Sequence, residues 1–363
     1  MKTMFRKCLD EIRPYSPGKP IDEVKRELGL SEVYKLASNE NPLGPPESAV
    51  EAMRLAAGKV SLYPDADAYE LRMALAEYHQ VKPEQIVFGD GSNELLKLLS
   101  LVFLEPGDEI IIPQPSFGEY VRCAKLCGAV AKPIPLNEDY VVDLPAMVAA
   151  ISSKTKLVYI CNPNNPTGTV VDKHLLKQLM HRMEDVIVVL DEAYFEFVSD
   201  EKSPDGVEFF REFPNVVALR TFSKAYGLAG MRVGYGICNE YIAAAINKVR
   251  EPFHVNSLAQ VAALAALNDH AYLKKSVEYN AVEREFLYTE LKKRGFKVVP
   301  SQTNFMLFDV VRDCVEVFKG LLEKGIITRS ADIFGYPTSI RLSVGLHSEN
   351  EAFLAALDEY MGL

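Results

Sequence analysis

Cysteine is scarce in this sequence, and the six residues present are scattered along the chain. None forms a C-x-x-C pair, which argues against the common zinc sites and against a dense disulfide framework. The pattern therefore predicts reduced thiols in a cytoplasmic protein. The cysteines are Cys8, Cys123, Cys127, Cys161, Cys238 and Cys314.

Long hydrophobic runs are also missing. The longest apolar stretch, residues 95–104, contains Lys97 and is too short to span a bilayer. Residues 1–14 include several basic side chains, but Asp10 and Glu11 interrupt them before any apolar core, which excludes a secretory signal. These features predict a soluble protein.

Basic residues are outnumbered by acidic ones, 40 against 50, which leaves a net charge of -10. This balance disfavours a protein that coats nucleic acid or an anionic membrane. The 48% hydrophobic and 25% charged residues are ordinary globular values and exclude a disordered, collagen-like or coiled-coil chain. An anionic ligand would thus require basic side chains gathered at one local site.

The 363 residues are enough for two domains or for one large α/β unit with attachments. Between about residues 84 and 238, short β-rich runs alternate with helical patterns, which predicts a mostly parallel sheet covered on both faces. After residue 256, two helices precede short strands and two further helices, as in an α+β unit. The early strands are expected at 86–88, 109–112, 157–161, 186–190, 216–219 and 233–237.

Two familiar nucleotide-binding signatures are incomplete. Asp191 ends an apolar strand as in nucleotide hydrolases, but the chain contains no G-x-x-x-x-G-K-[ST] loop. Residues 89–94 begin like a dinucleotide fingerprint, but Glu94 replaces its third glycine. NAD and ATP are therefore disfavoured. His174 and His181 lack a carboxylate partner at ligand spacing, so no metal site is expected.

Two other segments favour binding of an anion. Residues 89–94 form a flexible turn followed by a helix that Ser92 is expected to cap, and free amides at a helix start bind phosphate. Lys224 follows another predicted strand, near Arg232 and several glycines. Ligands in open α/β sheets bind at the carboxyl ends of strands, where Lys224 and Asp191 are both expected.

Three ordered motifs resemble the fold type I aminotransferases that use pyridoxal phosphate. They are Asn162-Pro163-Asn164-Asn165-Pro166-Thr167-Gly168, Asp191-Glu192-Ala193-Tyr194, and Ser223-Lys224-x-x-Gly227-Leu228-Ala229-Gly230-x-Arg232. Residues 36–45, Tyr63-Pro64-Asp65 and Ile12-Arg13-Pro14-Tyr15 are similar to the histidinol-phosphate aminotransferase branch. The resemblance extends from about residue 12 to the end of the chain.

The resemblance implies an α/β architecture. Residues 38–245 would form a large cofactor-binding domain with a mostly parallel seven-stranded sheet flanked by helices. Residues 246–363 would form a smaller α+β domain. Residues 1–37 would form an N-terminal arm with a helix that packs with the small domain.

The resemblance also implies roles at a site for pyridoxal 5'-phosphate. Lys224 would hold the cofactor covalently and carry protons, while Asp191 would keep its ring nitrogen protonated. Asn165 and Tyr194 would bond the phenolic oxygen of the ring. Phe117 would stack on the ring, although a core phenylalanine is the competing interpretation. The expected phosphate ligands are Gly91, Ser92, Asn93, Thr221, Ser223 and Arg232.

Substrate contacts are implied in the same way. Arg341 resembles the arginine that grips the α-carboxylate of the amino donor, and with Arg329 and Tyr15 it would also receive a substrate phosphate. Asn39 is a further expected substrate contact. Tyr63 resembles the tyrosine that a neighbouring subunit contributes to the cofactor phosphate, which implies a homodimer. An exposed cation and a turn tyrosine are the alternatives for Arg329 and Tyr63.

The implied reaction is reversible amino transfer from L-histidinol phosphate to 2-oxoglutarate, which gives imidazole acetol phosphate and L-glutamate in histidine biosynthesis. An aromatic amino-acid aminotransferase and a phosphothreonine decarboxylase remain alternatives. A non-catalytic module of a transcription regulator would need a helix-turn-helix domain, and the residues before Asn39 are too few to supply one. The sequence assigns no residue to imidazole recognition.

Overall fold

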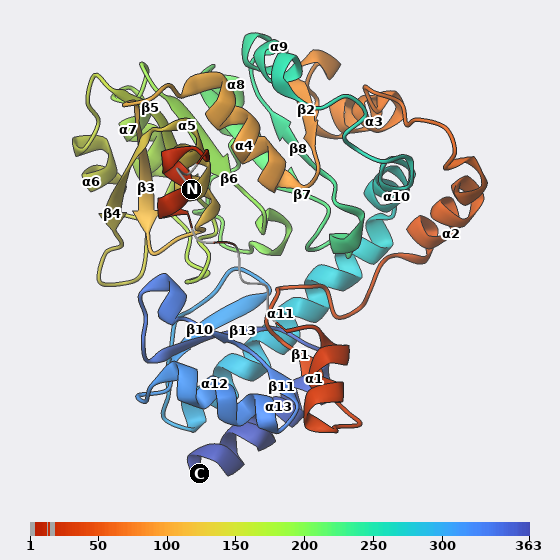
Figure 1. Ribbon diagram of the computed structural model, residues 1–363, viewed down its shortest axis with the longest axis vertical. Helices are drawn as coiled ribbons and strands as arrows, with labels where there is room; N and C mark the ends of the chain where they lie inside the picture. The colour runs from red at the N-terminus through yellow and green to blue at the C-terminus, as the bar shows by residue number, and fades with distance from the viewer. Residues whose placement is uncertain (1–3, 13, 15–18) are drawn as a thin grey trace.

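The computed structural model describes residues 4–12, 14 and 19–363. Its strands form a seven-stranded, a four-stranded and a two-stranded sheet. The seven-stranded sheet occupies the upper part of Figure 1 and the four-stranded sheet the lower part, with helix α11 (His270–Lys293) passing from one to the other. Across the described residues, no helix is both long and apolar enough to cross a membrane.

The large sheet is parallel except for one strand. Strand β8 is antiparallel to both of its neighbours, β2 and β7, and every other pair is parallel. The predicted mostly parallel seven-stranded sheet is therefore confirmed. In spatial order its strands are β2 (Ile86–Gly89), β8 (Gly234–Ile237), β7 (Val216–Thr221), β6 (Ile187–Asp191), β5 (Thr155–Cys161), β3 (Glu109–Gln114) and β4 (Val130–Pro135).

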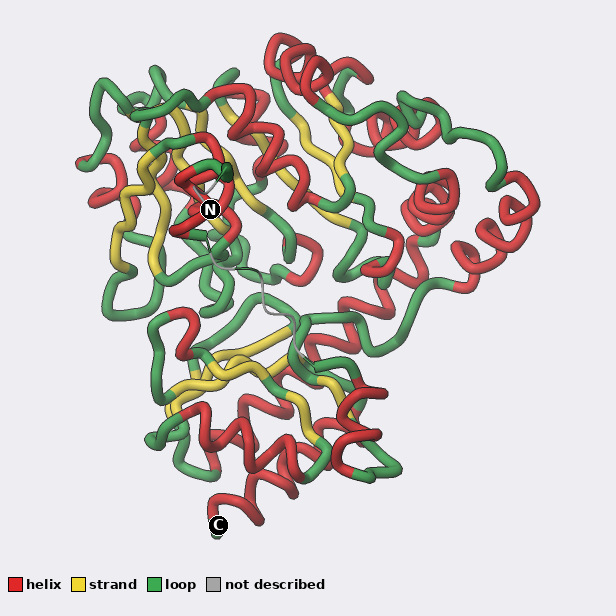
Figure 2. Tube along the Cα trace, in the orientation of Figure 1, coloured by secondary structure: helices red, strands yellow, loops and turns green. Residues whose placement is uncertain are grey.

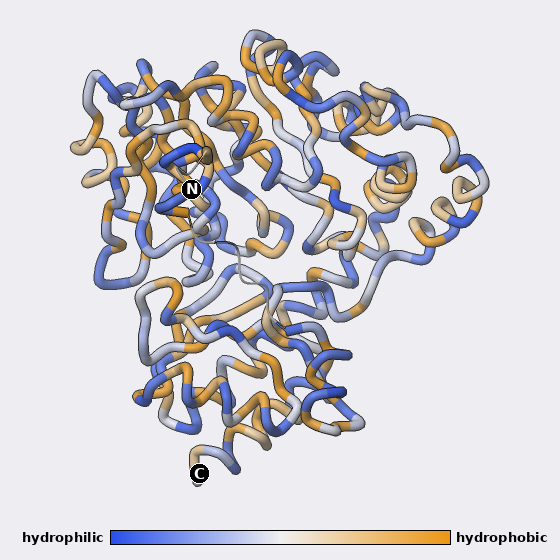
Figure 3. The backbone as a smooth tube through the Cα atoms, viewed as in Figure 1, coloured by the Kyte–Doolittle hydropathy of each residue, from blue (hydrophilic) through white to orange (hydrophobic). Residues whose placement is uncertain are grey.

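Helices cover both faces of this sheet, because its buried side chains alternate between two cores. Tyr159 and Cys161 belong to one core and Val158 and Ile160 to the other. The first core is closed by α4 (Ser92–Phe103), α5 (Glu119–Cys127) and α9 (Glu240–Val249). The second is closed by α2 (Glu47–Ala56), α3 (Tyr69–His79), α6 (Leu144–Ala149), α7 (Lys173–Met180), α8 (Gly206–Glu212) and α10 (Ser257–Asn268). Figure 3 shows the hydrophobic and hydrophilic stretches that alternate along these covering helices.

The four-stranded sheet is antiparallel and packs against α11, α12 (Cys314–Glu323) and α13 (His347–Met361). Its order is β12 (Arg329–Ser330), β13 (Ser339–Ser343), β10 (Phe305–Asp309) and β9 (Lys297–Val298). Short 3-10 turns complete the structure: η1 (Lys7–Glu11), η2 (Ala57–Lys59), η3 (Pro83–Gln85), η4 (Phe195–Phe197), η5 (Ala229–Met231) and η6 (Asp332–Phe334). Figure 2 shows how loops link the elements of the two parts.

The N-terminal segment contributes to the smaller part of the molecule. Strand β1 (Tyr34–Lys35) pairs in parallel with β11 (Ile326–Ile327), and Val24 of α1 (Ile21–Leu28) is buried against Ile327. Helix α10, which was expected in the small domain, instead packs with the large sheet. It lies on α2, and its alanines join the core of that sheet. The division at residues 37 and 245 stays a prediction. We propose that the second boundary lies between α10 and α11, near Asp269.

A buried ion network lies beneath the carboxyl ends of β6 and β7. Arg220 Nε donates to Glu192 Oε2 at 3.0 Å, and Arg220 Nη2 donates to Asp205 Oδ1 at 2.9 Å. The same guanidinium lies 3.5 Å from the centre of the Phe195 ring. The side chains of Arg220 and Glu192 are 4% and 0% exposed, so neither charge has water as an alternative partner. The network fixes the segment that follows Asp191.

Arg220→Met is expected to lower the free energy of unfolding by about 3–5 kcal/mol, because it leaves Glu192 as an uncompensated buried charge. Chemical denaturation followed by circular dichroism measures the loss. Adding Glu192→Gln to the same chain removes that charge and should restore part of the stability. Lys177→Met is the control, since its ion pair with Glu212 is exposed and should contribute less than about 1 kcal/mol. Equal losses in the two single variants would contradict the prediction.

Candidate active site

The candidate site lies where β6 and β7 end. These neighbouring strands are parallel, with Asp191 opposite Leu219, so the segments that follow them leave the sheet at the same edge. Asp191 is the last residue of β6, and Lys224 follows shortly after the end of β7. The Lys224 Nζ atom lies 5.7 Å from the ring centre of Tyr194, which belongs to the segment after β6. The predicted convergence of these residues is present in the structure.

Lys224 is a partly exposed amine in a cationic environment. Its Nζ donates a 3.3 Å hydrogen bond to the Ser38 carbonyl oxygen. Burial lowers the pKa of Lys224 to about 8, and the positive charge of Arg341 acts in the same direction. At neutral pH a larger share of this amine is therefore unprotonated than in an ordinary lysine, and only the unprotonated amine can act as a nucleophile or a base.

Asp191 is buried, with 4% of its surface exposed. The Tyr120 hydroxyl donates to its Oδ2 atom at 2.6 Å, while Oδ1 has no hydrogen-bond partner among the described residues. Burial raises the pKa of this carboxyl, and the Tyr120 hydrogen bond lowers it. A buried carboxylate oxygen without a donor is costly, and it suits a ligand that brings an N–H group.

Tyr194 is held by two amides. Asn39 Nδ2 donates to its hydroxyl oxygen at 3.0 Å and Asn165 Nδ2 at 3.5 Å. Asn39 is fixed in turn by Ser343, whose hydroxyl accepts from the Asn39 backbone amide at 2.8 Å and donates to Asn39 Oδ1 at 2.9 Å. Burial raises the pKa of Tyr194 to about 12, so this phenol stays a neutral donor.

Arg341 connects three segments of the chain. It stands on β13, and its Nη1 donates to Asn165 Oδ1 at 2.8 Å, while Nη2 donates to the Ala37 carbonyl oxygen at 2.6 Å. The Phe305 and Phe334 ring centres lie 5.4 and 5.7 Å from its Cζ atom, within the range of cation–π attraction. The guanidinium is thus oriented next to the asparagine that contacts Tyr194.

A second cationic feature surrounds the start of α4. A Cβ atom on Gly91 would lie 2.4 Å from Arg232 Nη2, and one on Gly234 would lie 2.4 Å from the Ser92 amide nitrogen. Gly234 pairs with Thr221 of β7, whose hydroxyl donates to Ser223 Oγ at 3.0 Å. The predicted phosphate ligands Gly91, Ser92, Asn93, Thr221, Ser223 and Arg232 are therefore gathered around one helix start.

The expected cap of this helix was wrong. The N-cap residue of α4 is Gly91, at φ 73°, and Ser92 is the first helical residue. The left-handed backbone conformation required before the helix is one that glycine adopts without strain. Gly91 makes no side-chain cap, so the first amides of α4 are not blocked by a protein oxygen from that position.

Other predicted residues lie around this centre. Phe117 precedes α5 and meets the Tyr120 ring edge to face, with ring centres 5.8 Å apart. Arg329 of β12 pairs in register with Arg341 of β13, which brings two cationic residues to the same strand pair. Tyr15 lies outside the described residues.

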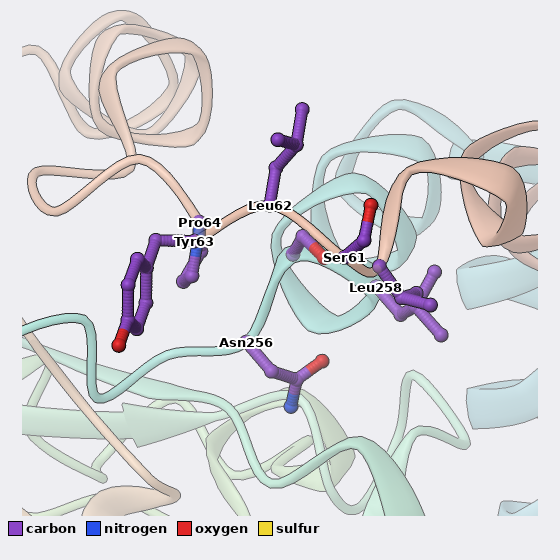
Figure 4. A pocket seen from close by; sticks show the side chains of 8 residues that line it. Ser61, Leu62, Tyr63, Pro64, Asn256 and Leu258 are labelled. Atoms are coloured by element: carbon purple, nitrogen blue, oxygen red, sulfur yellow. The ribbon is translucent and has the colours of Figure 1, made fainter.

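Tyr63 is separate from the cluster around Lys224. It is 82% exposed, and its ring stacks on Phe253 with centres 4.7 Å apart. It borders a shallow pocket that Asn256 and Leu258 also line (Figure 4). The side chain points outward from this chain, which is compatible with a contact to another subunit.

Two contacting residues were not anticipated from the sequence. Ser343 binds Asn39, and the alternation of Arg341 and Ser343 along one strand would have placed both on the same face. Tyr120 binds Asp191, but its place in a predicted amphipathic helix is equally typical of a core residue. Only the packing of α5 against the sheet shows that Tyr120 bonds Asp191 and is not merely a core residue.

The chain belongs to the aminotransferase class I and II family, whose model matches residues 31–357. As a member of this family it is an aminotransferase, and the predicted resemblance is confirmed. Over 98% of its length it is 48% identical to the histidinol-phosphate aminotransferase of Moorella thermoacetica, of which it covers 92%. It is 44% identical to the histidinol-phosphate aminotransferase of Bacillus subtilis strain 168, over 98% of this chain and 99% of that relative.

A solved structure supports the same assignment. The crystal structure of histidinol-phosphate aminotransferase from Sinorhizobium meliloti, in complex with pyridoxal-5'-phosphate, matches with a TM-score of 0.90 at 29% identity. The match covers 100% of this chain and 98% of that structure. The predicted fold class, a fold type I aminotransferase, is confirmed.

We expect competitive acetylation to show half-maximal reactivity of Lys224 near pH 8. Below this pH the amine is protonated and unreactive, and above it the neutral amine reacts. An ordinary lysine titrates near pH 10.4 instead. Mass spectrometry of the peptide that contains Lys224, labelled in the folded protein without added ligand, gives the titration curve. Arg341→Met should move the midpoint to higher pH by removing a neighbouring positive charge; a midpoint at the ordinary lysine value in the unsubstituted protein would contradict the expectation.

Proposed function

We propose that this protein transfers an amino group between L-histidinol phosphate and 2-oxoglutarate, in reversible exchange with imidazole acetol phosphate and L-glutamate, as a step of histidine biosynthesis. The observation that carries the proposal is similarity over nearly the whole chain, at 48% identity, to a histidinol-phosphate aminotransferase. The cluster of Lys224, Asp191 and Arg341 supports it, because amino transfer requires an amine base, an acid and an anion-binding group.

Pyridoxal 5'-phosphate is the cofactor that fits these residues. It has an aldehyde for the Lys224 amine, a protonated ring nitrogen that can donate a hydrogen bond to the unpaired Oδ1 of Asp191, and a phosphate for the start of α4. Gly91 leaves the room that a phosphate needs beside Arg232. When bound, the cofactor supplies an electron sink for negative charge that develops on the substrate α-carbon.

The residues of the chain would transfer the protons and hold the parts of the cofactor. Lys224 Nζ would take the proton from the substrate α-carbon and deliver it to the cofactor carbon that keeps the amino group, which an amine with a pKa near 8 can do near neutral pH. Asp191 would hold a proton on the cofactor's ring nitrogen. Tyr194 and Asn165 would hold its phenolic oxygen, and Phe117 would cover the face of its ring. The phosphate would be bound by Gly91, Ser92, Asn93, Thr221, Ser223 and Arg232.

Both substrates would use one anion-binding region. The forked guanidinium of Arg341 suits the α-carboxylate of glutamate and also the phosphate of histidinol phosphate. Arg329 lies in register beside it on β12 and adds a second positive charge, while Asn39 would complete the wall of the pocket. Tyr15 is proposed as a further phosphate ligand. A shared site explains how the two half-reactions proceed in one pocket.

The test is formation of L-glutamate and of imidazole acetol phosphate in a coupled assay. Histidinol phosphate and 2-oxoglutarate should react, and Lys224→Ala should lower the rate by at least about 10³-fold, because it removes the base. Lys156→Ala is the matched control, since that lysine is exposed and lies near the start of β5, whereas the site lies at the carboxyl ends of the strands. Retention of turnover by Lys224→Ala would refute the mechanism.

The choice of substrate is decided in single-turnover experiments on the same protein. Histidinol phosphate is expected to convert the visible absorption of the bound cofactor to that of its amine form faster than phenylalanine does. Faster conversion by phenylalanine would favour an aromatic amino-acid aminotransferase. Release of carbon dioxide from phosphothreonine would identify a decarboxylase instead.

We also propose that the working unit is a cytoplasmic homodimer, in which Tyr63 reaches the cofactor phosphate of the other subunit. The exposed ring of Tyr63 and the free state of the six cysteines support this proposal. A nucleic acid or a membrane is not an expected partner, because the chain carries a net charge of -10.

A hybrid experiment tests the shared site. Lys224→Ala and Tyr63→Ala chains should each be weakly active alone, and unfolding and refolding them together should produce dimers with one intact site. Activity above that of either parent is the expected result of the coupled assay. A mixture no more active than the sum of its parents would contradict a contribution of Tyr63 across subunits. A Tyr241→Ala chain, which also loses an exposed tyrosine, is the control for Tyr63→Ala.

A further inference from the structure

Tyr120 is a buried residue to which the proposed mechanism assigns no role. It lies in the first turn of α5, is 0% exposed, and belongs to the core between α4, α5 and the large sheet. Its hydroxyl nevertheless donates a 2.6 Å hydrogen bond to Asp191 Oδ2. A bond of this length to a carboxylate is of the strong, charge-assisted kind.

The position of Tyr120 is fixed by its ring. The ring stacks on that of Tyr159 of β5, with centres 4.6 Å apart and planes inclined by 16°. The ring edge of Phe117 lies on another side, with centres 5.8 Å apart. Two aromatic neighbours and complete burial leave the hydroxyl few alternative directions, so the hydrogen bond to Asp191 is pre-organised.

The protonation of Tyr120 is suited to this role. Burial and the nearby Asp191 carboxylate raise the pKa of the Tyr120 phenol well above its ordinary value, so it remains a hydrogen-bond donor. Donation to one carboxylate oxygen stabilises the ionised form of Asp191 over the protonated form. The second oxygen, Oδ1, remains buried without a partner among the described residues.

We propose that Tyr120 is a positioning residue that fixes the orientation of Asp191 and keeps it ionised, so that the proton shared with the cofactor stays on the ring nitrogen. This inference rests on the proposed function, because it requires pyridoxal phosphate at the site. When the pair holds one proton, that proton resides either on the ring nitrogen or on the carboxylate. The Tyr120 hydrogen bond favours the ionic arrangement, since a hydroxyl donates more strongly to a carboxylate than to a carboxylic acid.

The test compares Tyr120→Phe with Tyr159→Phe. Both variants remove one hydroxyl from the same buried stacked pair, but no hydrogen bond joins Tyr159 to Asp191 in the described structure. Each protein is loaded with pyridoxal phosphate labelled with ¹⁵N in its ring. The ¹⁵N chemical shift should be that of a protonated ring in the unsubstituted protein and in Tyr159→Phe. It should move toward that of a neutral pyridine in Tyr120→Phe.

Two further readouts separate positioning from a general structural effect. The affinity of the cofactor-free protein for pyridoxal phosphate should fall about tenfold in Tyr120→Phe and change less than about twofold in Tyr159→Phe. In the same variant kcat should fall by about tenfold, while KM for histidinol phosphate stays within about twofold. Identical ¹⁵N shifts and affinities in the two variants would overturn the inference.

If Tyr120→Phe does not fold, a second substitution at the same position tests the inference. Incorporating 3-fluorotyrosine at position 120 makes the hydroxyl a stronger donor without changing the shape of the core. The ¹⁵N shift should then move from that of a hydrogen-bonded pyridinium toward that of a free pyridinium, because Asp191 becomes a weaker acceptor for the ring proton. An unchanged shift would overturn the inference. Failure of the proposed function is distinguishable, because the unsubstituted protein would then not bind pyridoxal phosphate or form glutamate.

Discussion

The organisation of the site depends on the hydrogen bonds of one guanidinium. Arg341 comes from the four-stranded sheet, yet it binds Asn165 at the edge of the seven-stranded sheet and the Ala37 carbonyl near the start of the chain. A planar group with several fixed donors can hold three segments in one geometry, which a flexible ammonium group would not do. Arg341 holds Asn165 and Ser343 of the same strand holds Asn39, so β13 fixes both asparagines that contact Tyr194.

The site contains several positively charged residues, although the chain as a whole is negatively charged. The protein carries a net charge of -10, but Arg341 lies close enough to Lys224 for its positive charge to lower the pKa of the Lys224 amine. Mutual repulsion of cations normally costs stability, and a reactive amine gains from it because the neutral form becomes accessible. The net negative charge of the chain and the cationic groups of the site are therefore separate features, and the second would favour the binding of an anion.

Much of the fold could be predicted from the sequence. Short apolar runs predicted six strands of the large sheet, because nearly all side chains of these strands are buried between the covering helices. Strand β4 was not predicted, since Pro133 and Pro135 weaken its pattern; the strand is tolerated because it lies at the sheet edge. The helix start at Gly91 was shifted by one residue, because a glycine in the left-handed region replaced the expected side-chain cap.

The site was predicted unevenly, for physical reasons. Lys224 and Asp191 could be predicted because each is a chemically reactive residue type at a fixed place in a motif that follows a strand. Tyr120 gives no such signal, because a buried aromatic on a helix face looks the same whether its hydroxyl is idle or bonded to a carboxylate. No residue was assigned to imidazole recognition, because no motif in the sequence indicates one.

Gly234 has a consequence for how this family of sequences can change. The first turn of α4 rests directly on the backbone of β8, with no side chain between them, because a Cβ at this position would lie 2.4 Å from the Ser92 amide. The proposed phosphate site would therefore be made largely of main chain. At such a site a change of the Asn93 side chain would cost little anion binding, whereas a single methyl group added at Gly234 would push the start of α4 away from β8.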